Sequence, residues 1–184
     1  MAHTFDAANA DVLDDVSRYR FLSRDELLGA LDPAPEGAVA DLGSGTGFYT
    51  AGIAPHAGTV YAVDVQSAMH ARFRENGVPG NVSLVTAAAG ALPFRDGCLD
   101  AAVSTMTFHE VATPDAMAEI ARVLAPRGRL VTADWSAAGE GAAGPPLAER
   151  RDAAAAADLL AGAGFRVERA SERPETFLVV AAAP

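Results

Sequence analysis

Short apolar runs alternate with helical segments along most of the chain. Five runs are continuous in apolar residues, as expected of parallel strands that are covered on both faces of a sheet. They are residues 38–42, 59–63, 82–86, 99–104 and 128–134. Helices are predicted at about residues 46–56, 66–76 and 114–124. This alternation predicts an α/β fold with a doubly wound sheet.

The two ends of the chain depart from this alternation. Residues 1–31 have apolar positions at mixed spacings of three and four, which predicts a helical segment before the sheet. Near the other end, residues 153–161 are rich in strong helix-forming residues and are followed by glycines, which predicts a helix that ends there. Residues 165–169 then alternate and residues 176–181 are apolar, which predicts an antiparallel hairpin at one sheet edge.

A glycine-rich turn follows the first predicted strand. Gly43, Gly45 and Gly47 allow positive φ angles and let backbone N–H groups approach a ligand more closely than a Cβ would permit. The second strand ends at Asp64, 21 residues after Gly43. A carboxylate there would accept hydrogen bonds from the two hydroxyls of a ribose, so this stretch predicts a nucleoside cofactor.

The same turn indicates which nucleoside cofactor is bound. A dinucleotide-binding loop has a small residue at its sixth position, where this chain has Phe48. The phosphate-binding G-x-x-x-x-G-K-[ST] loop is also absent, and the chain contains no lysine. A nicotinamide oxidoreductase is therefore disfavoured, and a cofactor without phosphates remains.

Five landmarks in order carry a resemblance to a known family. They are residues 41–47 (Asp-Leu-Gly-Ser-Gly-Thr-Gly), 63–64 (Val-Asp), 92–94 (Leu-Pro-Phe), 99–100 (Leu-Asp) and 122–130 (Arg-Val-Leu-Ala-Pro-Arg-Gly-Arg-Leu). From about Ala38 onward the chain resembles a class I S-adenosylmethionine-dependent methyltransferase with a ubiquinone- or menaquinone-methyltransferase-like core. The resemblance implies a Rossmann-like sheet of seven strands, S-adenosylmethionine as cofactor and a small-molecule methyl acceptor.

We expect a single domain of residues 1–184, since the chain is too short for a large second module. Within it, residues 1–35 would form an N-terminal helical lid and residues 36–184 the Rossmann-like core.

The resemblance also implies a set of cofactor-binding residues. Asp64 would bind the ribose, and Asp41 would hold the loop and contact the amino group of the cofactor directly or through water. The remaining implied cofactor contacts are Gly43, Ser44, Gly45, Gly47, Val65, Ala88, Ala89 and Thr105. The family usually has an aspartate at the position of Ala88, and the lost hydrogen bond to adenine is worth on the order of 1 kcal/mol. Met69 either contacts adenine or belongs to the core.

Candidate residues for the acceptor lie after the fourth strand and at two further places. Residues 104–111 resemble the family segment that lines both sites, and His109 there is the candidate general base, since an imidazole pKa near 6.5 suits proton removal. His109 could equally be a positioning or packing residue. Tyr19, Trp135 and Arg150 are candidate substrate residues, although packing explains the two aromatic residues equally well.

Composition narrows the function classes. The net charge is −10, from 14 basic and 24 acidic residues, and such a surface repels phosphate backbones, so nucleic-acid partners are disfavoured. The single cysteine, Cys98, excludes an intramolecular disulfide, and the histidines His3, His56, His70 and His109 lack ligand-like spacing, so no metal is expected. Abundant acid and alanine without lysine fit a GC-rich genome or a halophile, and we favour a halophile.

Neither a membrane span nor a secretory leader is indicated. No apolar run reaches 18 residues, and the first residues lack a basic start followed by an apolar core. We therefore expect a cytoplasmic protein without a membrane partner. Two alternatives to a small-molecule methyltransferase remain, which are a non-catalytic S-adenosylmethionine-binding or regulatory protein, suggested by Ala88, and a protein methyltransferase. The sequence does not indicate the oligomeric state.

Overall fold

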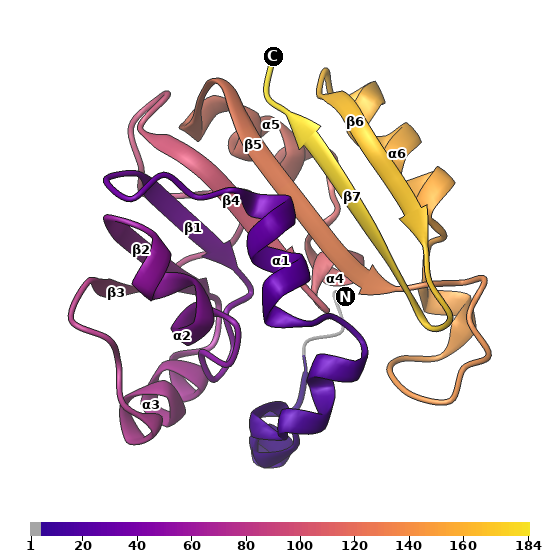
Figure 1. The fold of residues 1–184 in the computed structure, drawn as a ribbon, viewed down its shortest axis with the longest axis horizontal. Helices are drawn as coiled ribbons and strands as arrows, with labels where there is room; N and C mark the ends of the chain where they lie inside the picture. The colour runs from indigo at the N-terminus through magenta and orange to yellow at the C-terminus, as the bar shows by residue number, and fades with distance from the viewer. Residues whose placement is uncertain (1–4) are drawn as a thin grey trace.

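The predicted apolar runs become neighbouring strands of one sheet in the computed structural model, which describes residues 5–184. The strands are β1 (Ala38–Leu42), β2 (Thr59–Asp64), β3 (Val82–Thr86), β4 (Leu99–Thr105), β5 (Leu124–Trp135), β6 (Arg166–Glu172) and β7 (Thr176–Ala182). Their order is β3-β2-β1-β4-β5-β7-β6 (Figure 1), with β7 antiparallel to β5 and β6 and the other pairs parallel. The predicted fold class is confirmed.

Residues 5–184 form six α-helices and four 3₁₀ segments. One α-helix and two 3₁₀ segments precede the first strand, while the others lie between strands. The helices are α1 (Arg24–Leu31), α2 (Thr50–Ile53), α3 (Ser67–Asn76), α4 (Phe108–Val111), α5 (Pro114–Val123) and α6 (Ala153–Gly162). The 3₁₀ segments are η1 (Ala7–Asp14), η2 (Val16–Arg20), η3 (Ala54–His56) and η4 (Leu147–Glu149). Side chains of Ser23, Thr113 and Asp152 cap α1, α5 and α6 by accepting a backbone N–H bond, which explains where these helices begin.

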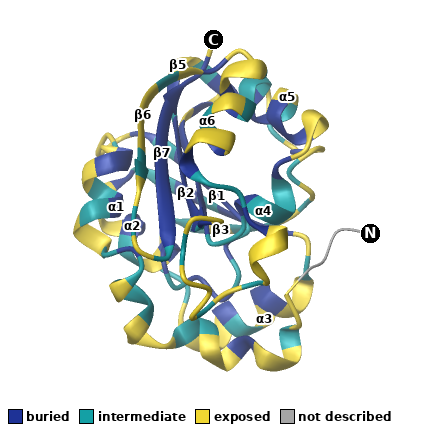
Figure 2. Ribbon diagram, turned by 90° about the vertical axis from the view of Figure 1, so that its right-hand side faces the viewer, coloured by how far each residue is buried: buried dark blue, intermediate teal, exposed yellow. Residues whose placement is uncertain are grey.

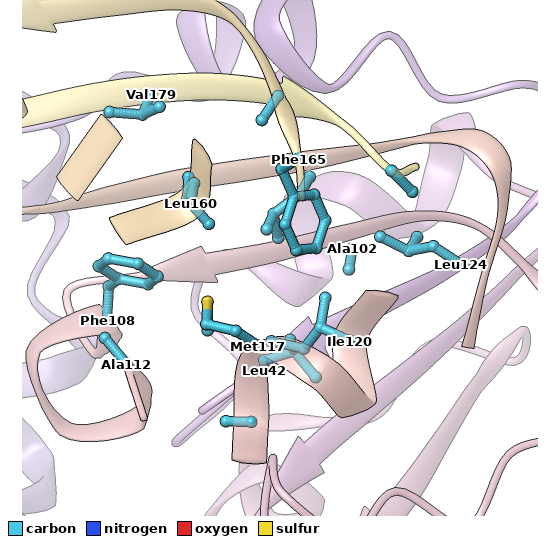
Figure 3. Packing of buried hydrophobic residues seen from close by; sticks show 14 of the residues in the cluster. Leu42, Ala102, Phe108, Ala112, Met117, Ile120, Leu124, Leu160, Phe165 and Val179 are labelled. Carbon is cyan, nitrogen blue, oxygen red and sulfur yellow. The ribbon is translucent and has the colours of Figure 1, made fainter. Parts of the chain in front are cut away.

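Hydrophobic cores lie on both faces of the sheet. On one face α1 and α2 pack their buried residues, among them Leu27 and Ile53, against the strands. On the other face Met117 and Ile120 of α5 meet Leu160 of α6 (Figure 3). Because side chains alternate along a strand, every residue of β7 is buried between these layers, whereas β6 at the sheet edge is largely exposed (Figure 2).

Three predicted boundaries differ from the structure. The helix predicted at residues 46–56 begins only at Thr50, because Gly43, Gly45 and Gly47 all take positive φ angles and keep the backbone irregular up to that point. β5 starts at Leu124 and not at residue 128. The N-terminal helical segment consists of η1 and η2 followed by α1, and residues 1–4 of it, with His3, lie outside the described residues.

The strand order creates a switch point between β1 and β4. From β1 the chain proceeds to β2 and β3 on one side, and it returns to β4 on the other side. In open α/β sheets a ligand binds at the carboxyl ends of the strands at such a point. The N-terminal segment lies at this edge of the sheet (Figure 1), so it is placed to cover a ligand there.

Candidate functional site

A cavity of about 780 Å³ lies at the carboxyl ends of β1, β2 and β4. Its walls come from the turn after β1, the end of β2, the segment after β4, residues 5–21 and the loop before α6. Nine predicted site residues lie in its lining, namely Gly43, Ser44, Gly45, Asp64, Val65, Ala89, Thr105, His109 and Trp135. Met69, for which two interpretations were open, also lines the cavity although it is buried.

The backbone amides of the glycine turn bind the protein itself. The N–H groups of Gly43 and Ser44 both donate to the carbonyl of Val63, at 2.8 and 2.9 Å, and Gly45 N–H donates to Asp64 Oδ2 at 2.9 Å. In this structure the N–H groups of the first three positions of the turn are used within the protein, and their contact with a cofactor stays a prediction. An anion would find no free amides there, and α2 begins too late to direct its N-terminus at the turn, which disfavours a pyrophosphate-bearing cofactor.

Glycine is needed at two positions of this turn for packing. Gly43 has φ of +76°, and a Cβ there would lie 2.4 Å from Cγ2 of Thr107, so the turn approaches the segment after β4 closely. Gly47 has φ of +85°, and a Cβ there would lie 2.3 Å from the ring of Phe73 on α3. Gly47, predicted as a cofactor contact, lies outside the cavity lining and allows α3 to pack beneath the turn.

Asp64 connects the turn to the end of β2. Its Oδ2 accepts the Gly45 N–H and its Oδ1 accepts the N–H of Gln66 at 2.8 Å. Each oxygen of a carboxylate can accept more than one hydrogen bond, so Asp64 retains acceptor capacity toward the cavity that it lines. The side chain is thus held at two points before any ligand binds.

Asp41 lies beneath the turn and outside the cavity lining. It is 1% exposed, its Oδ2 accepts a 2.6 Å bond from the Thr50 hydroxyl, and its Oδ1 is buried without a hydrogen-bond partner. Burial, and to a lesser degree the charge of Asp64, raise the pKa of Asp41 to about 6, although Thr50 and Arg18 oppose the shift. The expected direct contact between Asp41 and a cofactor is therefore not supported, and its charge acts from below the turn.

The N-terminal segment contributes Arg18 and Phe21 to the cavity, whereas Tyr19 lies outside the lining. Three residues per turn in a 3₁₀ helix place Arg18 and Phe21 on one side and Tyr19 on another. Tyr19 packs on Phe48 with ring centroids 4.7 Å apart. Tyr19 is thus a packing residue here, and the cavity-facing position is its neighbour.

Arg18 is a partly buried cation at the glycine turn. Its guanidinium donates to the Leu13 carbonyl at 2.6 Å and lies over the rings of Phe48 and Tyr49, at 5.0 and 5.3 Å from their centroids. Burial lowers the pKa of Arg18 from its usual high value. Asp41 and Arg18 each influence the pKa of the other, so the guanidinium in the cavity lining lies close to the carboxylate that is buried beneath the turn.

His109 lies on α4, in the segment after β4, and lines the cavity. Its Nδ1 lies 2.9 Å from Oδ2 of Asp134, which is buried near the end of β5, and its backbone N–H donates to the same oxygen at 2.5 Å. Burial by itself would lower the pKa of His109, but the bond to Asp134 and the charges of Asp134, Glu110 and Glu149 together raise it. Glu110, which belongs to the predicted segment 104–111, and Glu149 also line the cavity.

Trp135 and the loop before α6 form the wall beside His109. The Trp135 ring packs edge-on against Phe21 with centroids 4.7 Å apart. A Cβ on Gly144 would lie 2.3 Å from Cδ2 of the Trp135 ring, so the loop backbone rests directly on the indole. Packing therefore occupies much of the ring that was expected to stack on a substrate.

Arg150 is enclosed by the protein and lies outside the cavity lining. Its side chain is 1% exposed and donates to the carbonyls of Pro145, at 2.8 Å, and Ser136, at 3.4 Å, and to that of Ala143. The prediction that it contacts the substrate is not supported. Arg150 holds the loop whose residues Gly144 and Pro145 face the cavity.

Ala88 also falls outside the lining, although its neighbours Ala87 and Ala89 are part of it. Ala88 is exposed, and its carbonyl accepts a turn bond from the Ala91 N–H at 3.0 Å. Met106, within the predicted segment 104–111, also lines the cavity, and its φ of +56° is uncommon for a residue with a side chain and marks a constrained backbone.

Residues 5–184 show neither a metal-binding cluster nor a membrane-spanning helix. Within this range no group of three or more histidine, cysteine, aspartate or glutamate side chains is arranged to hold a metal ion. None of the helices described there combines the length and the apolar character that crossing a membrane requires.

Comparison with known sequences gives a family and relatives. A family model described as a methyltransferase domain matches residues 40–132. The ubiquinone/menaquinone biosynthesis C-methyltransferase UbiE of Shewanella sp. (strain ANA-3) is 34% identical over 143 residues, covering 71% of this chain and 56% of that protein. The chain thus spans a little over half the length of the curated relatives it matches.

Solved structures resemble the whole chain. A SAM-dependent methyltransferase from Aquifex aeolicus has a TM-score of 0.87 and 28% identity, covering 98% of this chain and 100% of that one. Geranyl diphosphate methyltransferase in complex with SAM has a TM-score of 0.75, covering 99% of this chain and 93% of that one. At 17% identity the second likeness shows the fold alone.

Proposed function

Because the chain belongs to the class I S-adenosylmethionine-dependent methyltransferases, we propose that it transfers the methyl group of S-adenosylmethionine to a small-molecule acceptor. Members of this family use S-adenosylmethionine as methyl donor. The observation that carries the proposal is the cavity at the switch point, where a carboxylate, a glycine turn and a histidine line one space. The bound cofactor supplies an activated methyl group, so the protein mainly aligns the acceptor and excludes water.

The residues at the glycine turn fit this cofactor. Asp64 offers acceptor capacity for the ribose hydroxyls, and the buried Ser44 hydroxyl in the lining has no partner among the described residues. The amides of Gly43 and Ser44 are used within the protein, which suits a cofactor without phosphates. Arg18 in the lining provides a positive charge that matches the carboxylate of the methionine tail, and Asp41 adds negative charge from beneath the turn.

Residues 5–31 would act as a lid over the cofactor. Asp14 accepts bonds from Arg72 and Asn76 on α3, at 3.3 and 3.0 Å, and Asp11 forms an ion pair with Arg72. The Gln66 amide also donates to the carbonyl of Phe5 at 2.9 Å. These contacts hold the segment over the cavity end at which the ribose would lie.

Cavity size supports a small acceptor. A nucleoside cofactor of this kind fills on the order of 400 Å³, which leaves a comparable volume within the 780 Å³ cavity. The remaining walls include Phe21, Trp135, Pro145 and Pro146. His109 lies among them and would accept a proton from the acceptor.

Calorimetry and a transfer assay test the proposal together. We expect S-adenosylmethionine and S-adenosylhomocysteine to bind with micromolar dissociation constants, and tritium from the labelled methyl group to appear in the organic extract of a lysate. Absence of binding at millimolar concentration would remove the proposal. Label in the protein fraction alone would select a protein methyltransferase, and binding without any transfer would favour a regulatory protein.

Cofactor affinity should depend on pH through Asp41. Its raised pKa of about 6 means that the free protein holds a proton there at pH 5 and loses it by pH 7. A cationic cofactor favours the ionised form, so we expect affinity for S-adenosylmethionine to rise about tenfold from pH 5 to pH 7. Calorimetry of wild type and Asp41→Asn across this range checks this, and a slope that persists in the variant would contradict it.

Protein stability should respond to Asp41 with the opposite sign. The folded state binds the proton more tightly than the unfolded chain, whose carboxyl has a pKa near 3.8. The contribution of Asp41 to the free energy of unfolding therefore falls as pH rises from about 4 to about 6, and it stays low above that range. Urea unfolding of Asp41→Asn should lack this decline.

A further inference from the structure

The ring of His109 is held by a buried carboxylate on a neighbouring element. Nδ1 lies 2.9 Å from Oδ2 and 3.1 Å from Oδ1 of Asp134. Asp134 is 1% exposed and also accepts the Trp135 N–H at 2.8 Å, so its own orientation is set by backbone bonds. The contact joins α4, which carries His109, to the end of β5.

This contact determines which ring nitrogen carries the proton. A carboxylate only accepts hydrogen bonds, so Nδ1 of the neutral ring must be the protonated nitrogen. Nε2 then keeps its lone pair, and it is the nitrogen left for the cavity that His109 lines. Oε1 of Glu110 is 3.9 Å from Nε2, beyond hydrogen-bond distance.

His70 shows what a packing histidine looks like in the same protein. Its Nδ1 is 3.1 Å from the Thr86 hydroxyl, and its Nε2 is buried without a partner. Burial lowers the pKa of His70, as expected for a ring kept neutral in the interior. His109 differs in its charged partner and its access to the cavity, and Asp134, Glu110 and Glu149 face it from β5, α4 and η4.

We propose that Asp134 is a positioning residue that holds His109 as a base, and that the methyl acceptor therefore attacks through an atom bearing a dissociable proton. This inference rests on the proposed methyltransferase function and narrows its substrate class. Alcohols, phenols, primary amines and carbon acids belong to this class of acceptors. Thioethers and tertiary amines, which have no such proton, do not.

The step balances in atoms and charge. The electron pair of the attacking atom forms the new bond to the methyl carbon, the methyl–sulfur bond breaks with its pair on sulfur, and the released proton passes to Nε2 of His109. The positive charge that leaves the sulfonium thus reappears on the imidazole ring. Asp134, Glu110 and Glu149 surround that ring, so the protein stabilises the charge where it arrives.

Nitrogen NMR of ¹⁵N-histidine-labelled protein tests the positioning role without an acceptor. We expect His109 in the wild type to be protonated at Nδ1 when neutral, and to titrate above the ordinary pKa. In Asp134→Asn we expect the pKa to fall by about one unit and the preference for the Nδ1 tautomer to be lost. The His70 signal should stay unchanged in that variant. It serves as the control that Asp134→Asn retains the native fold.

Transfer kinetics test the substrate class with labelled S-adenosylmethionine and matched pairs of acceptors. Phenol and benzylamine would be compared with anisole and dimethylbenzylamine, and only members bearing a proton should be methylated. For a methylated member, Asp134→Asn should lower kcat tenfold or more at little change in KM, and it should shift the rising limb of the pH profile to lower pH.

The outcomes separate the inference from the proposed function. A wild-type His109 protonated at Nε2, or a pH profile that Asp134→Asn does not move, would overturn the positioning role. Transfer to dimethylbenzylamine that is as fast as transfer to benzylamine would overturn the substrate class. Failure to bind S-adenosylmethionine would instead contradict the proposed function, while leaving the tautomer of His109 to be read independently.

Discussion

Replacing Asp64 with alanine is expected to weaken binding of S-adenosylmethionine about thirtyfold, which corresponds to about 2 kcal/mol. The variant removes the acceptor proposed for two ribose hydroxyls. It also frees the N–H groups of Gly45 and Gln66, which Asp64 holds at 2.9 and 2.8 Å, so the turn loses its tie to β2. Calorimetric titration with the cofactor measures the effect directly.

Asp64→Asn keeps the size of the side chain but loses one of its two acceptor oxygens. The amide keeps one acceptor oxygen but turns an NH₂ group toward one of two backbone donors, so we expect a loss close to that of alanine.

Asp100→Ala is the matched control, because Asp100 Oδ2 also accepts a backbone N–H, that of Ala38 at 2.8 Å, outside the cavity. We expect Asp100→Ala to lower stability but to leave affinity within twofold of wild type. Wild-type affinity in Asp64→Ala would show that the ribose lies elsewhere.

The strand positions could be predicted because they follow from the pattern of apolar and polar residues along the chain. The apolar runs at residues 38–42 and 82–86 coincide with β1 and β3, and the hairpin of β6 and β7 is antiparallel as expected. The secondary structure of the N-terminal segment was predicted less accurately from the sequence. Asp6 and Asp15 each cap a short 3₁₀ segment by accepting a nearby backbone N–H, and two such segments before α1 produce the mixed apolar spacing that looked like one helical region.

The predicted site residues that lie next to strand ends are found in the cavity lining. Gly43, Asp64 and Thr105 directly follow or end a strand, and a parallel sheet brings those ends together whatever the connections do. Some predicted site residues on irregular backbone lie outside the cavity lining. Tyr19 and Arg150 lie one residue from cavity-lining neighbours, and which residue of such a segment faces inward depends on local dihedral angles that composition does not reveal.

The partnership of His109 with Asp134 illustrates what sequence alone could not provide. The two residues are separated by 25 positions, and they meet because β4 and β5 pair in parallel with Thr105 beside Ala133. That register places the residue after Ala133 next to the helix that follows β4. His109 was a candidate from the sequence, but its contact with Asp134 is a property of the register.

Replacing His109 with glutamine is expected to lower kcat by 10² to 10³-fold, within the range of general base catalysis. Glutamine preserves much of the side-chain volume and a hydrogen-bonding group toward Asp134, but it cannot accept a proton near neutral pH. Since His109 is proposed to act on the acceptor and not on the cofactor, we expect affinity for S-adenosylmethionine to stay within twofold. The tritium transfer assay with a methylated panel acceptor and calorimetry with the cofactor measure the two quantities separately.

His56→Gln is the control for this variant, because His56 is exposed on η3 and lies outside the cavity lining. It should retain wild-type kcat.

In the wild type the rate should rise with pH through the raised pKa of His109, because only the neutral ring accepts a proton. In His109→Gln that limb should vanish while a low, pH-independent rate remains. A variant that keeps both the wild-type rate and its rising limb would show that the proton leaves the acceptor by another route, and that Asp134 and His109 serve only to fasten α4 to β5.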